Sequence, residues 1–319
     1  MALIESNKIT KTYIKTSYNL RRPFRINREI KTAVKELDLS IDKGEFVGFL
    51  GSNGAGKTTF LKILSGIMHP TSGMAKVMGY VPWERDYRYL HQMAIVMGQK
   101  NQLWWDLPAI DSYNLLQAIY DLPDKQYKKN LDMMIEVLDM KDLLTKRLRN
   151  MSLGERMKCE LAASFLHDPK VVFLDEPTIG LDVVSSRSIR KFLQMMNKER
   201  KCTFILTSHY IGDIEELCKR VVIITQGEKV YDGTLTKLKQ QYAPNKKIEI
   251  ILHNLDEKKK FAHLKAKNKK IAEDKGIILA DKNILGDVTK EVFSKFSLEN
   301  VTISDPATEE IIRKIFAQK

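Results

Sequence analysis

The sequence predicts an α/β protein with one large domain and one smaller domain. One observation is a glycine-rich segment, Gly51–Thr58, which follows an apolar run and opens into a helical pattern. Another is the apolar run Val171–Leu174, which ends in the adjacent carboxylates of Asp175 and Glu176. Short, wholly apolar runs are typical of parallel strands that are covered on both faces. The length of 319 residues leaves room for a second domain beside the first.

The glycine-rich segment is predicted to bind the phosphates of a nucleotide. It reads Gly-Ser-Asn-Gly-Ala-Gly-Lys-Thr, a full match to the phosphate-loop pattern G-x-x-x-x-G-K-[ST]. The run Phe46–Leu50 before it predicts a buried strand, and the spacing in Thr59–Leu64 after it predicts a helix. Lys57 is expected to reach the β- and γ-phosphates, and the Thr58 hydroxyl to ligate Mg²⁺. The predicted ATP-binding residues of this segment are Gly51, Ser52, Asn53, Gly54, Ala55, Gly56, Lys57, Thr58 and Thr59.

The two carboxylates after Val171–Leu174 are predicted to serve ATP hydrolysis. Ligands of open α/β sheets bind at the carboxyl ends of the strands, which is where Asp175 and Glu176 follow their strand. Asp175 is expected to hold Mg²⁺, and Glu176 to orient or deprotonate the attacking water. An Asp-Glu-Pro segment can also begin a solvated turn, so the prediction depends on the phosphate loop.

Further motifs occur in a fixed order and complete a resemblance to a known family. They are Tyr13, Gln99, the loop Ser152-Leu153-Gly154-Glu155, the loop Gly180-Leu181-Asp182, and His209 after Thr207-Ser208. Over about residues 1–238 the chain resembles an ATP-binding cassette (ABC) ATPase, the motor subunit of an ABC transporter. The resemblance implies a P-loop NTPase fold, with a RecA-like core, an antiparallel β subdomain and a helical subdomain. It also implies ATP hydrolysis with Mg²⁺.

The resemblance implies roles for three residues around the nucleotide. Tyr13 resembles the aromatic residue that stacks on adenine, with Tyr18 and Phe24 as alternatives for that position. Gln99 resembles the glutamine that contacts Mg²⁺ and reports on the γ-phosphate. His209 resembles the switch histidine that contacts the γ-phosphate, so Glu176 and His209 are the predicted catalytic residues.

Two further loops are implied to act between two copies of the cassette. Ser152 and Gly154, together with Glu155, resemble the signature loop that meets the γ-phosphate of the nucleotide held by the other copy. Asp182 resembles the residue of the loop that connects the two nucleotide sites. The resemblance therefore implies a dimer, either of this chain or with a paralogous cassette.

The signature departs from the usual family wording, which is Ser-Gly-Gly-Gln. Leu153 replaces the first glycine and Glu155 replaces the glutamine. A carboxylate near phosphates is unfavourable unless it is paired, and Arg156 or Lys158 is expected to supply the pairing. This wording resembles a branch of prokaryotic drug and viologen exporters.

The chain is predicted to contain a cassette at residues 1–240 and a small C-terminal α+β domain at residues 243–319. The helical subdomain is expected at about residues 100–165, with helices over 109–120 and 125–140. Trp104 and Trp105 either line a groove for a membrane partner or pack the subdomain core. The C-terminal domain, with dimer stabilisation or regulation as its expected role, is predicted to contain strands at 247–253, 276–280 and 301–304, and helices at 255–272, 287–296 and from Asp305-Pro306 onward.

Composition and charge predict no membrane span and are compatible with a position beside a membrane. No apolar run approaches about 20 residues, and the N-terminus lacks the apolar segment of a signal peptide. The net charge of +13 suits either a solvated face or an anionic inner leaflet, and nucleic acid is the less favoured partner. The cysteines, Cys159, Cys202 and Cys218, form no C-x-x-C pair and fit a reducing cytosol.

The predicted function is that of an ATP-hydrolysing motor subunit, on the cytoplasmic side of the membrane, which drives separate permease subunits. The resemblance favours an exporter. The alternative is a soluble ABC ATPase that acts on ribosomes or DNA. Such proteins usually carry two cassettes in one chain or long insertions, and the sequence shows neither.

Overall fold

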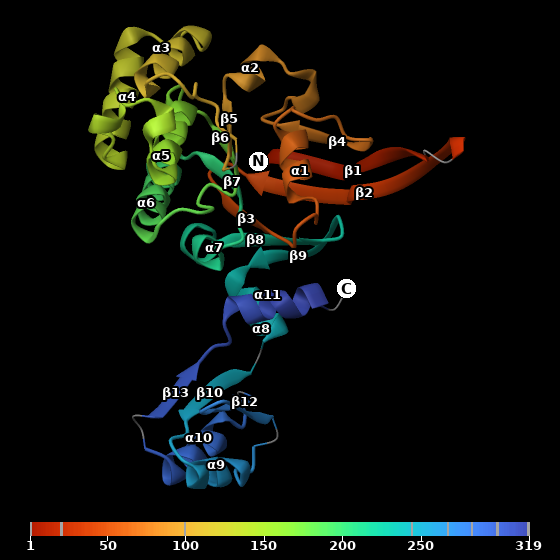
Figure 1. The fold of residues 1–319 in the computed structure, drawn as a ribbon, viewed down its shortest axis with the longest axis vertical. Coiled ribbons are helices and arrows are strands. Elements are labelled where there is room, and N and C mark those ends of the chain that lie inside the picture. Colours follow the sequence, from red (N-terminus) through yellow and green to blue (C-terminus); the bar gives the residue numbers. More distant parts are fainter. Residues whose placement is uncertain are drawn as a thin grey trace. The chain divides into compact units, whose positions relative to one another are not determined.

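The computed structural model describes residues 2–19, 22–98, 100–243, 245–266, 268–281, 283–297 and 300–317, and side chains except those of residues 15–28. The chain forms two compact units, residues 1–233 and residues 234–319 (Figure 1). In the structure the helix α8 (Leu235–Tyr242) belongs to the second unit, where it packs with α11 (Thr308–Ala317).

A six-stranded sheet is the centre of the first unit. Its strand order is β5-β6-β7-β3-β8-β9, and the pairs from β5 to β8 are parallel. Residues 171–174 of β6 are buried, which agrees with the prediction of a strand covered on both faces, and β3 and β7 are buried along their whole length. The strands are β3 (Phe46–Leu50), β5 (Met93–Met97), β6 (Val171–Asp175), β7 (Thr203–Thr207), β8 (Arg220–Thr225) and β9 (Glu228–Thr234).

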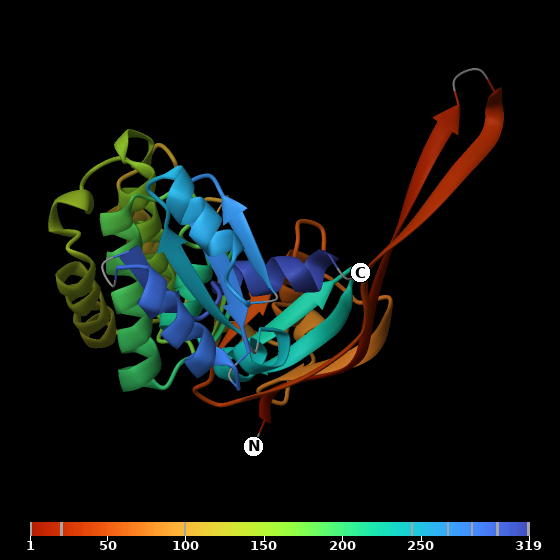
Figure 2. The same cartoon turned by 90° about the horizontal axis from the view of Figure 1, so that it is seen from below.

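A second, antiparallel sheet contains a long hairpin. Strands β1 (Ala2–Asn19) and β2 (Arg22–Asp42) pair along most of their length, and β4 (Ser72–Val77) pairs with the first part of β1. Near β4 the hairpin is anchored by fully buried apolar side chains such as Ile4 and Ile9, whereas its far end projects away from the rest of the first unit (Figure 2). No local pattern in the sequence predicts this hairpin.

The helical part of the first unit lies between β5 and β6 in the sequence. Pro108 and Pro123 precede α3 and α4 and stop the chain before each helix from extending backward. Leu131, Met134 and Leu138 form the buried face of α4, at the spacing that predicted a helix there. The helices of this unit are α1 (Lys57–Leu64), α2 (Tyr87–Leu90), α3 (Ala109–Ile119), α4 (Asp124–Leu138), α5 (Leu153–Phe165), α6 (Val183–Arg200) and α7 (Ile211–Leu217), with short 3-10 helices at Pro82–Glu84, Lys141–Leu143 and Leu148–Asn150.

The second unit contains a four-stranded antiparallel sheet of order β11-β12-β10-β13. Together with α9 and α10, the strands follow the order βαββαβ of ferredoxin-like domains. Ile248, Phe261 and Val292 are fully buried members of its core. The remaining elements are β10 (Lys246–Ile251), α9 (Leu255–Ala262), β11 (Lys269–Ala272), β12 (Lys275–Ala280), α10 (Leu285–Lys295) and β13 (Val301–Ser304).

The predicted helix over residues 255–272 is wrong in its second half. Helix α9 ends at Ala262, and Leu264 then turns into the core. Residues Lys269–Ala272 form a strand that pairs with β12 through a turn at Glu273, which has a φ of 56°. The sequence did not indicate the change from helical to strand spacing because this segment is rich in lysine. Long charged side chains suit an exposed helix face and an exposed strand equally.

Among the helices in the described ranges, none combines the length and the apolar character that a bilayer span requires.

Candidate nucleotide site

The phosphate loop lies between β3 and α1 and wraps around the side chain of Lys57. Lys57 is only 6% exposed, and its ammonium donates to the carbonyl oxygens of Gly51 at 2.7 Å and Ser52 at 3.1 Å. Burial lowers the pKa of Lys57, while the charges of Glu176 and Asp175 oppose that shift. The loop closes on Gly56, whose φ is 104° and whose missing Cβ would lie 2.1 Å from the carbonyl oxygen of Ala33.

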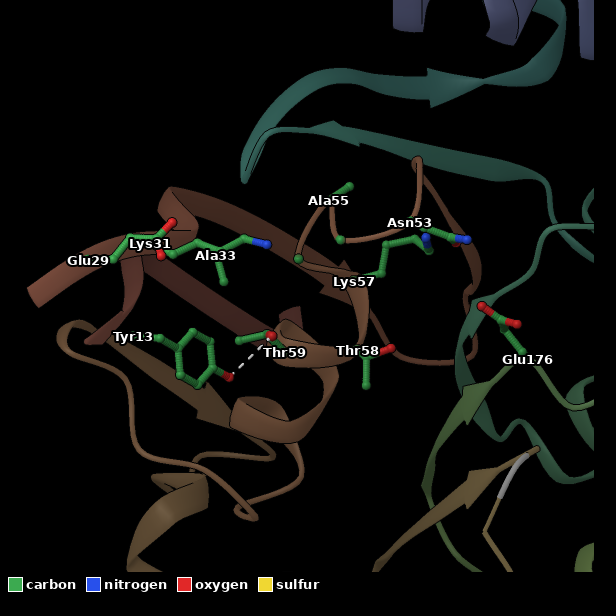
Figure 3. Close-up of a pocket in the computed structure, with 12 residues that line it drawn as sticks. Tyr13, Glu29, Lys31, Ala33, Asn53, Ala55, Lys57, Thr58, Thr59 and Glu176 are labelled. Atoms are coloured by element: carbon green, nitrogen blue, oxygen red, sulfur yellow. Dashed lines mark hydrogen bonds between the residues drawn. The ribbon is translucent and has the colours of Figure 1, made fainter. Parts of the chain in front are cut away.

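A cavity of about 570 Å³ lies along the phosphate loop (Figure 3). Tyr13 lies at one end and Glu176 at the other, with the loop between them. The Tyr13 hydroxyl lies 3.4 Å from the Thr59 hydroxyl and donates to the sulfur of Met68 at 3.1 Å. The lining residues are Tyr13, Glu29, Lys31, Ala33, Asn53, Gly54, Ala55, Gly56, Lys57, Thr58, Thr59 and Glu176.

The hairpin supplies lining residues that the sequence analysis missed. Lys31 pairs with Tyr13 across the β1–β2 ladder, and Glu29 lies two residues away on the same face of β2. These positions belong to the cavity only because the hairpin brings β2 beside the loop, which no local pattern announces. The alternatives to Tyr13, Tyr18 and Phe24, lie among the residues whose side chains the structure does not describe.

Asp175 meets the phosphate loop through two hydroxyl groups. The Thr58 hydroxyl lies 2.9 and 3.0 Å from the two carboxylate oxygens of Asp175. The Thr207 hydroxyl donates to the same carboxylate at 2.6 Å. Thr207 was missed from the sequence, although it ends β7 directly beside Asp175 in the parallel ladder. The arrangement gathers hydroxyl and carboxylate oxygens, which are the ligands that Mg²⁺ prefers.

Glu176 and His209 face each other beyond the end of β6. His209 Nε2 lies 2.8 Å from Glu176 Oε1, and both side chains remain partly exposed. Glu176 has a φ of 56°, and its amide donates to the carbonyl oxygen of Thr207 at 3.0 Å. This contact between the two strand ends brings the predicted catalytic pair together. Gln99 lies outside the described residues.

A buried polar network holds the segments that follow β6 and β7. Asp213 of α7 accepts hydrogen bonds from Thr178 and from Ser208, the latter at 3.0 Å. Arg190 of α6 pairs with the same carboxylate at 2.9 Å. The network ties the residue before His209 to the segment after Glu176, and the sequence analysis did not identify any of its members.

The signature residues begin α5 with a reciprocal cap. The Ser152 hydroxyl oxygen accepts from the Glu155 amide at 3.2 Å, and the Glu155 carboxylate accepts from the Ser152 amide at 2.7 Å. This is a capping box, which satisfies two amides that a helix start otherwise leaves unpaired. Ser152 therefore has a structural role in this chain that stands beside any role toward a second copy.

The charge partner of Glu155 is Lys146, which corrects the expectation of Arg156 or Lys158. Lys146 Nζ lies 2.9 and 3.1 Å from the two carboxylate oxygens. Its hydrogen bond, followed by that of the Ser152 amide, lowers the pKa of Glu155. Arg156 instead lies over the ring of Trp105, with its guanidinium 4.8 Å from the ring centroid. The sequence did not reveal Lys146 because this residue lies nine positions before Glu155, outside the signature motif.

Gly154 and Asp182 lie in contact at the starts of α5 and α6. Asp182 caps α6 by accepting from the amide of Ser185 at 2.9 Å and from its hydroxyl at 2.6 Å. A Cβ on Gly154 would lie 2.3 Å from the Ser185 hydroxyl oxygen and 3.5 Å from the Asp182 carboxylate. Glycine is therefore required at position 154 by packing within the chain.

Trp104 and Trp105 are not buried in the core of the helical part. Their exposed fractions are 49% and 44%, and Leu107 beside them is 39% exposed. This observation removes core packing as their main role, since core aromatic residues are enclosed.

Glu160 is a buried carboxyl group whose titration is predicted to affect stability. It is 3% exposed on α5, where it accepts from the amides of Gln102 and Leu103, and burial raises its pKa to about 7. Between about pH 4.5 and pH 7 the unfolded chain loses this proton while the folded chain keeps it, so the stabilisation is lost as pH rises. Relative to Glu160→Gln, the free energy of unfolding should fall by roughly 3 kcal/mol across this window.

Chemical denaturation of both chains at pH 4.5 and pH 8 measures this difference. Equal pH dependence of the two chains would show that Glu160 does not titrate differently in the folded state.

Comparison with known proteins shows the family to which the chain belongs. A family model described as ABC transporter matches residues 34–179. The ABC transporter ATP-binding protein NatA of Bacillus subtilis (strain 168) is 32% identical over 68% of this chain and 88% of its own length. The linearmycin resistance ATP-binding protein LnrL of the same organism is 32% identical over 71% of this chain and 72% of its own length.

Solved structures show the same fold. An ATP-binding subunit of an ABC transporter superposes with a TM-score of 0.63 at 25% identity, over 75% of this chain and 93% of that one. The cassette MJ0796, in a dimeric post-hydrolysis state bound to ADP and Pi, gives a TM-score of 0.62 at 22% identity, over 73% and 98%.

The fold and the site define a P-loop nucleoside triphosphatase of the cassette type. The chain belongs to the ABC transporter ATP-binding proteins. It is thus an ABC ATPase, and the resemblance stated from the sequence is confirmed. The alternative of an ATPase that acts on ribosomes or DNA finds no support in these relatives.

Proposed function

We propose that this chain is the motor subunit of a membrane exporter, in which two cassettes enclose two ATP molecules and drive separate permease subunits. The observation that supports it most is that Lys57, Thr58 and Glu176 line one cavity at the ends of β3 and β6. Asp175 contacts the Thr58 hydroxyl from the end of β6. A phosphate cradle, a metal-holding carboxylate and a carboxylate for water are the groups that ATP hydrolysis requires.

In the proposed mechanism the phosphate loop binds the triphosphate of ATP. Its amides and the ammonium of Lys57 would face the phosphate oxygens, and Lys57 would exchange its contacts with Gly51 and Ser52 for the β- and γ-phosphates. Tyr13, at the other end of the cavity, would stack on adenine. The hydroxyl of Thr58 and the carboxylate of Asp175 would hold Mg²⁺, which neutralises the charge that develops on the phosphates.

Glu176 would activate the attacking water. Its carboxylate lies at the edge of the cavity, and a carboxylate in hydrogen-bond reach of a water can orient it and accept its proton. His209, 2.8 Å from Glu176, would turn toward the γ-phosphate when ATP is bound. Gln99 would complete the contacts to Mg²⁺.

The signature loop would complete the site of a second cassette. Ser152 is exposed at the start of α5, where backbone amides point outward and favour an anion. Gly154 allows the close approach of α6, and Asp182 holds the loop between the two sites. The second cassette would be another copy of this chain or a paralogue.

The permease would bind the exposed apolar side chains of the helical part. Trp104, Trp105 and Leu107 lie together in sequence directly before α3 and are partly exposed, and Ile119 at its end is 52% exposed. Aromatic residues of this kind mark protein-binding surfaces. The net charge of +13 suits a position at the cytoplasmic face of an anionic membrane. The direction of transport is proposed as export because the relative LnrL is named a linearmycin resistance protein.

Copurification from solubilised membranes tests the proposal. A tagged chain should recover integral membrane proteins in stoichiometric amount, and Trp104→Ala should reduce that recovery. Lys141→Ala, at an exposed position in the same part of the chain, is the matched control and should recover the membrane proteins normally. Recovery of ribosomal proteins or DNA in place of membrane proteins would contradict the proposal.

A further inference from the structure

Lys146, which lies outside the signature loop, forms an ion pair with that loop. Its ammonium bridges both carboxylate oxygens of Glu155, at 2.9 and 3.1 Å. The two side chains are 37% and 31% exposed, so the pair lies at the surface that surrounds Ser152. Isolated ion pairs that are this exposed contribute little to the free energy of folding. Stability alone therefore does not explain the pair between Lys146 and Glu155.

The cap at the start of α5 does not require a negative charge. Glutamine and glutamate complete a capping box equally well, because only a side-chain oxygen has to reach the serine amide. A carboxylate adds a full negative charge three residues from Ser152. That charge repels phosphate oxygens brought to the same helix start, and the repulsion grows as water is excluded. A cation on the carboxylate removes this repulsion.

The cap uses the Ser152 hydroxyl as an acceptor and leaves its proton available for donation. Its oxygen accepts from the Glu155 amide at 3.2 Å, so its proton is not used in that bond. The proton is available for an acceptor outside the helix, such as a phosphate oxygen. The orientation of the Ser152 hydroxyl therefore depends on a second hydrogen bond, in which the Ser152 amide donates to the Glu155 carboxylate at 2.7 Å.

We propose that Lys146 is a positioning residue for closure of the two-cassette dimer on ATP: it neutralises Glu155 so that Ser152 can donate to the γ-phosphate of ATP held by a second cassette. Lys146 itself does not touch the nucleotide. The inference rests on the proposed function, since it assumes that Ser152 faces a second cassette. Arg156 cannot replace Lys146, because its guanidinium is held over Trp105.

The test uses chains that carry Glu176→Gln, so that ATP is bound without turnover. Lys146→Ala, Glu155→Gln and the double variant Lys146→Ala/Glu155→Gln are compared with this parent. Lys158→Ala is the matched control, because it also removes one positive charge near the signature loop. The structure describes no ion pair between Lys158 and Glu155. Dimer formation is measured against ATP concentration by size-exclusion chromatography with light scattering.

Lys146→Ala should raise the ATP concentration for half-dimerisation about tenfold, because it leaves the carboxylate unpaired at the closing interface. In the Glu155→Gln background the Lys146→Ala change should have no further effect, so the double variant should dimerise like Glu155→Gln, because no unpaired charge is left. The Lys146→Ala defect should shrink as potassium chloride is raised, since salt screens the exposed carboxylate. Lys158→Ala should dimerise like the parent.

A double variant as impaired as Lys146→Ala would overturn the inference, as would a Lys146→Ala chain that dimerises like the parent. Failure of the parent chain itself to dimerise with ATP is a different result. It would overturn the proposed two-cassette function, and the inference with it.

Discussion

Glu176→Gln is expected to lower the rate of ATP hydrolysis by roughly a thousandfold while ATP binding persists. Glutamine keeps the size and hydrogen-bonding reach of the side chain but cannot accept a proton from water. The backbone of residue 176, with its φ of 56°, is not disturbed by an isosteric change. Phosphate release measures turnover, and fluorescent-nucleotide titration measures binding.

A closed dimer should accumulate when this variant is given ATP and Mg²⁺. Glu136→Gln, the same chemical change on the exposed face of α4, is the control and should retain normal turnover. A Glu176→Gln chain that stays monomeric and keeps full activity would refute the role of this carboxylate.

Lys57→Ala is expected to weaken ATP binding by about a hundredfold or more, because two charge-assisted contacts to phosphate are lost. In the structure the ammonium lies inside the loop and holds the carbonyls of Gly51 and Ser52. The variant therefore also frees the loop to open. Affinity is measured by nucleotide titration, with circular dichroism to show that the fold persists.

Lys62→Ala, one turn further along α1 and outside the cavity, provides the comparison and should bind ATP normally. Unchanged ATP affinity of Lys57→Ala would refute the phosphate-loop assignment.

The parts of the fold that the sequence predicted are those with a strong local pattern. The loop between Phe46–Leu50 and α1, and the strand before Asp175, combine apolar runs with fixed spacings that few other structures share. The hairpin of β1 and β2 and the strand Lys269–Ala272 lack such patterns. Their conformations depend on pairing with strands that are distant in the sequence. A lysine-rich segment has no residue pattern from which that pairing can be predicted.

The same distinction separates the predicted and the unpredicted parts of the site. Lys57, Asp175 and Glu176 each occupy a motif and were named from it. Thr207 and Lys146 were not, because each contributes a single side chain across a contact between separate segments. Recognising them requires the register of β6 on β7 and the path of the loop before α5.

The close contact at Gly154 has a mechanical consequence. With no space for a methyl group between Gly154 and Ser185, and with Ser185 bound to Asp182, the starts of α5 and α6 form one stiff joint. Such close packing resists hinge motion between the two helix starts, so a displacement of one would move the other. In a dimer of cassettes, this rigid contact would couple the opening and closing of the two nucleotide sites. Ser185→Gly removes the side chain that makes the contact, so it would weaken that coupling.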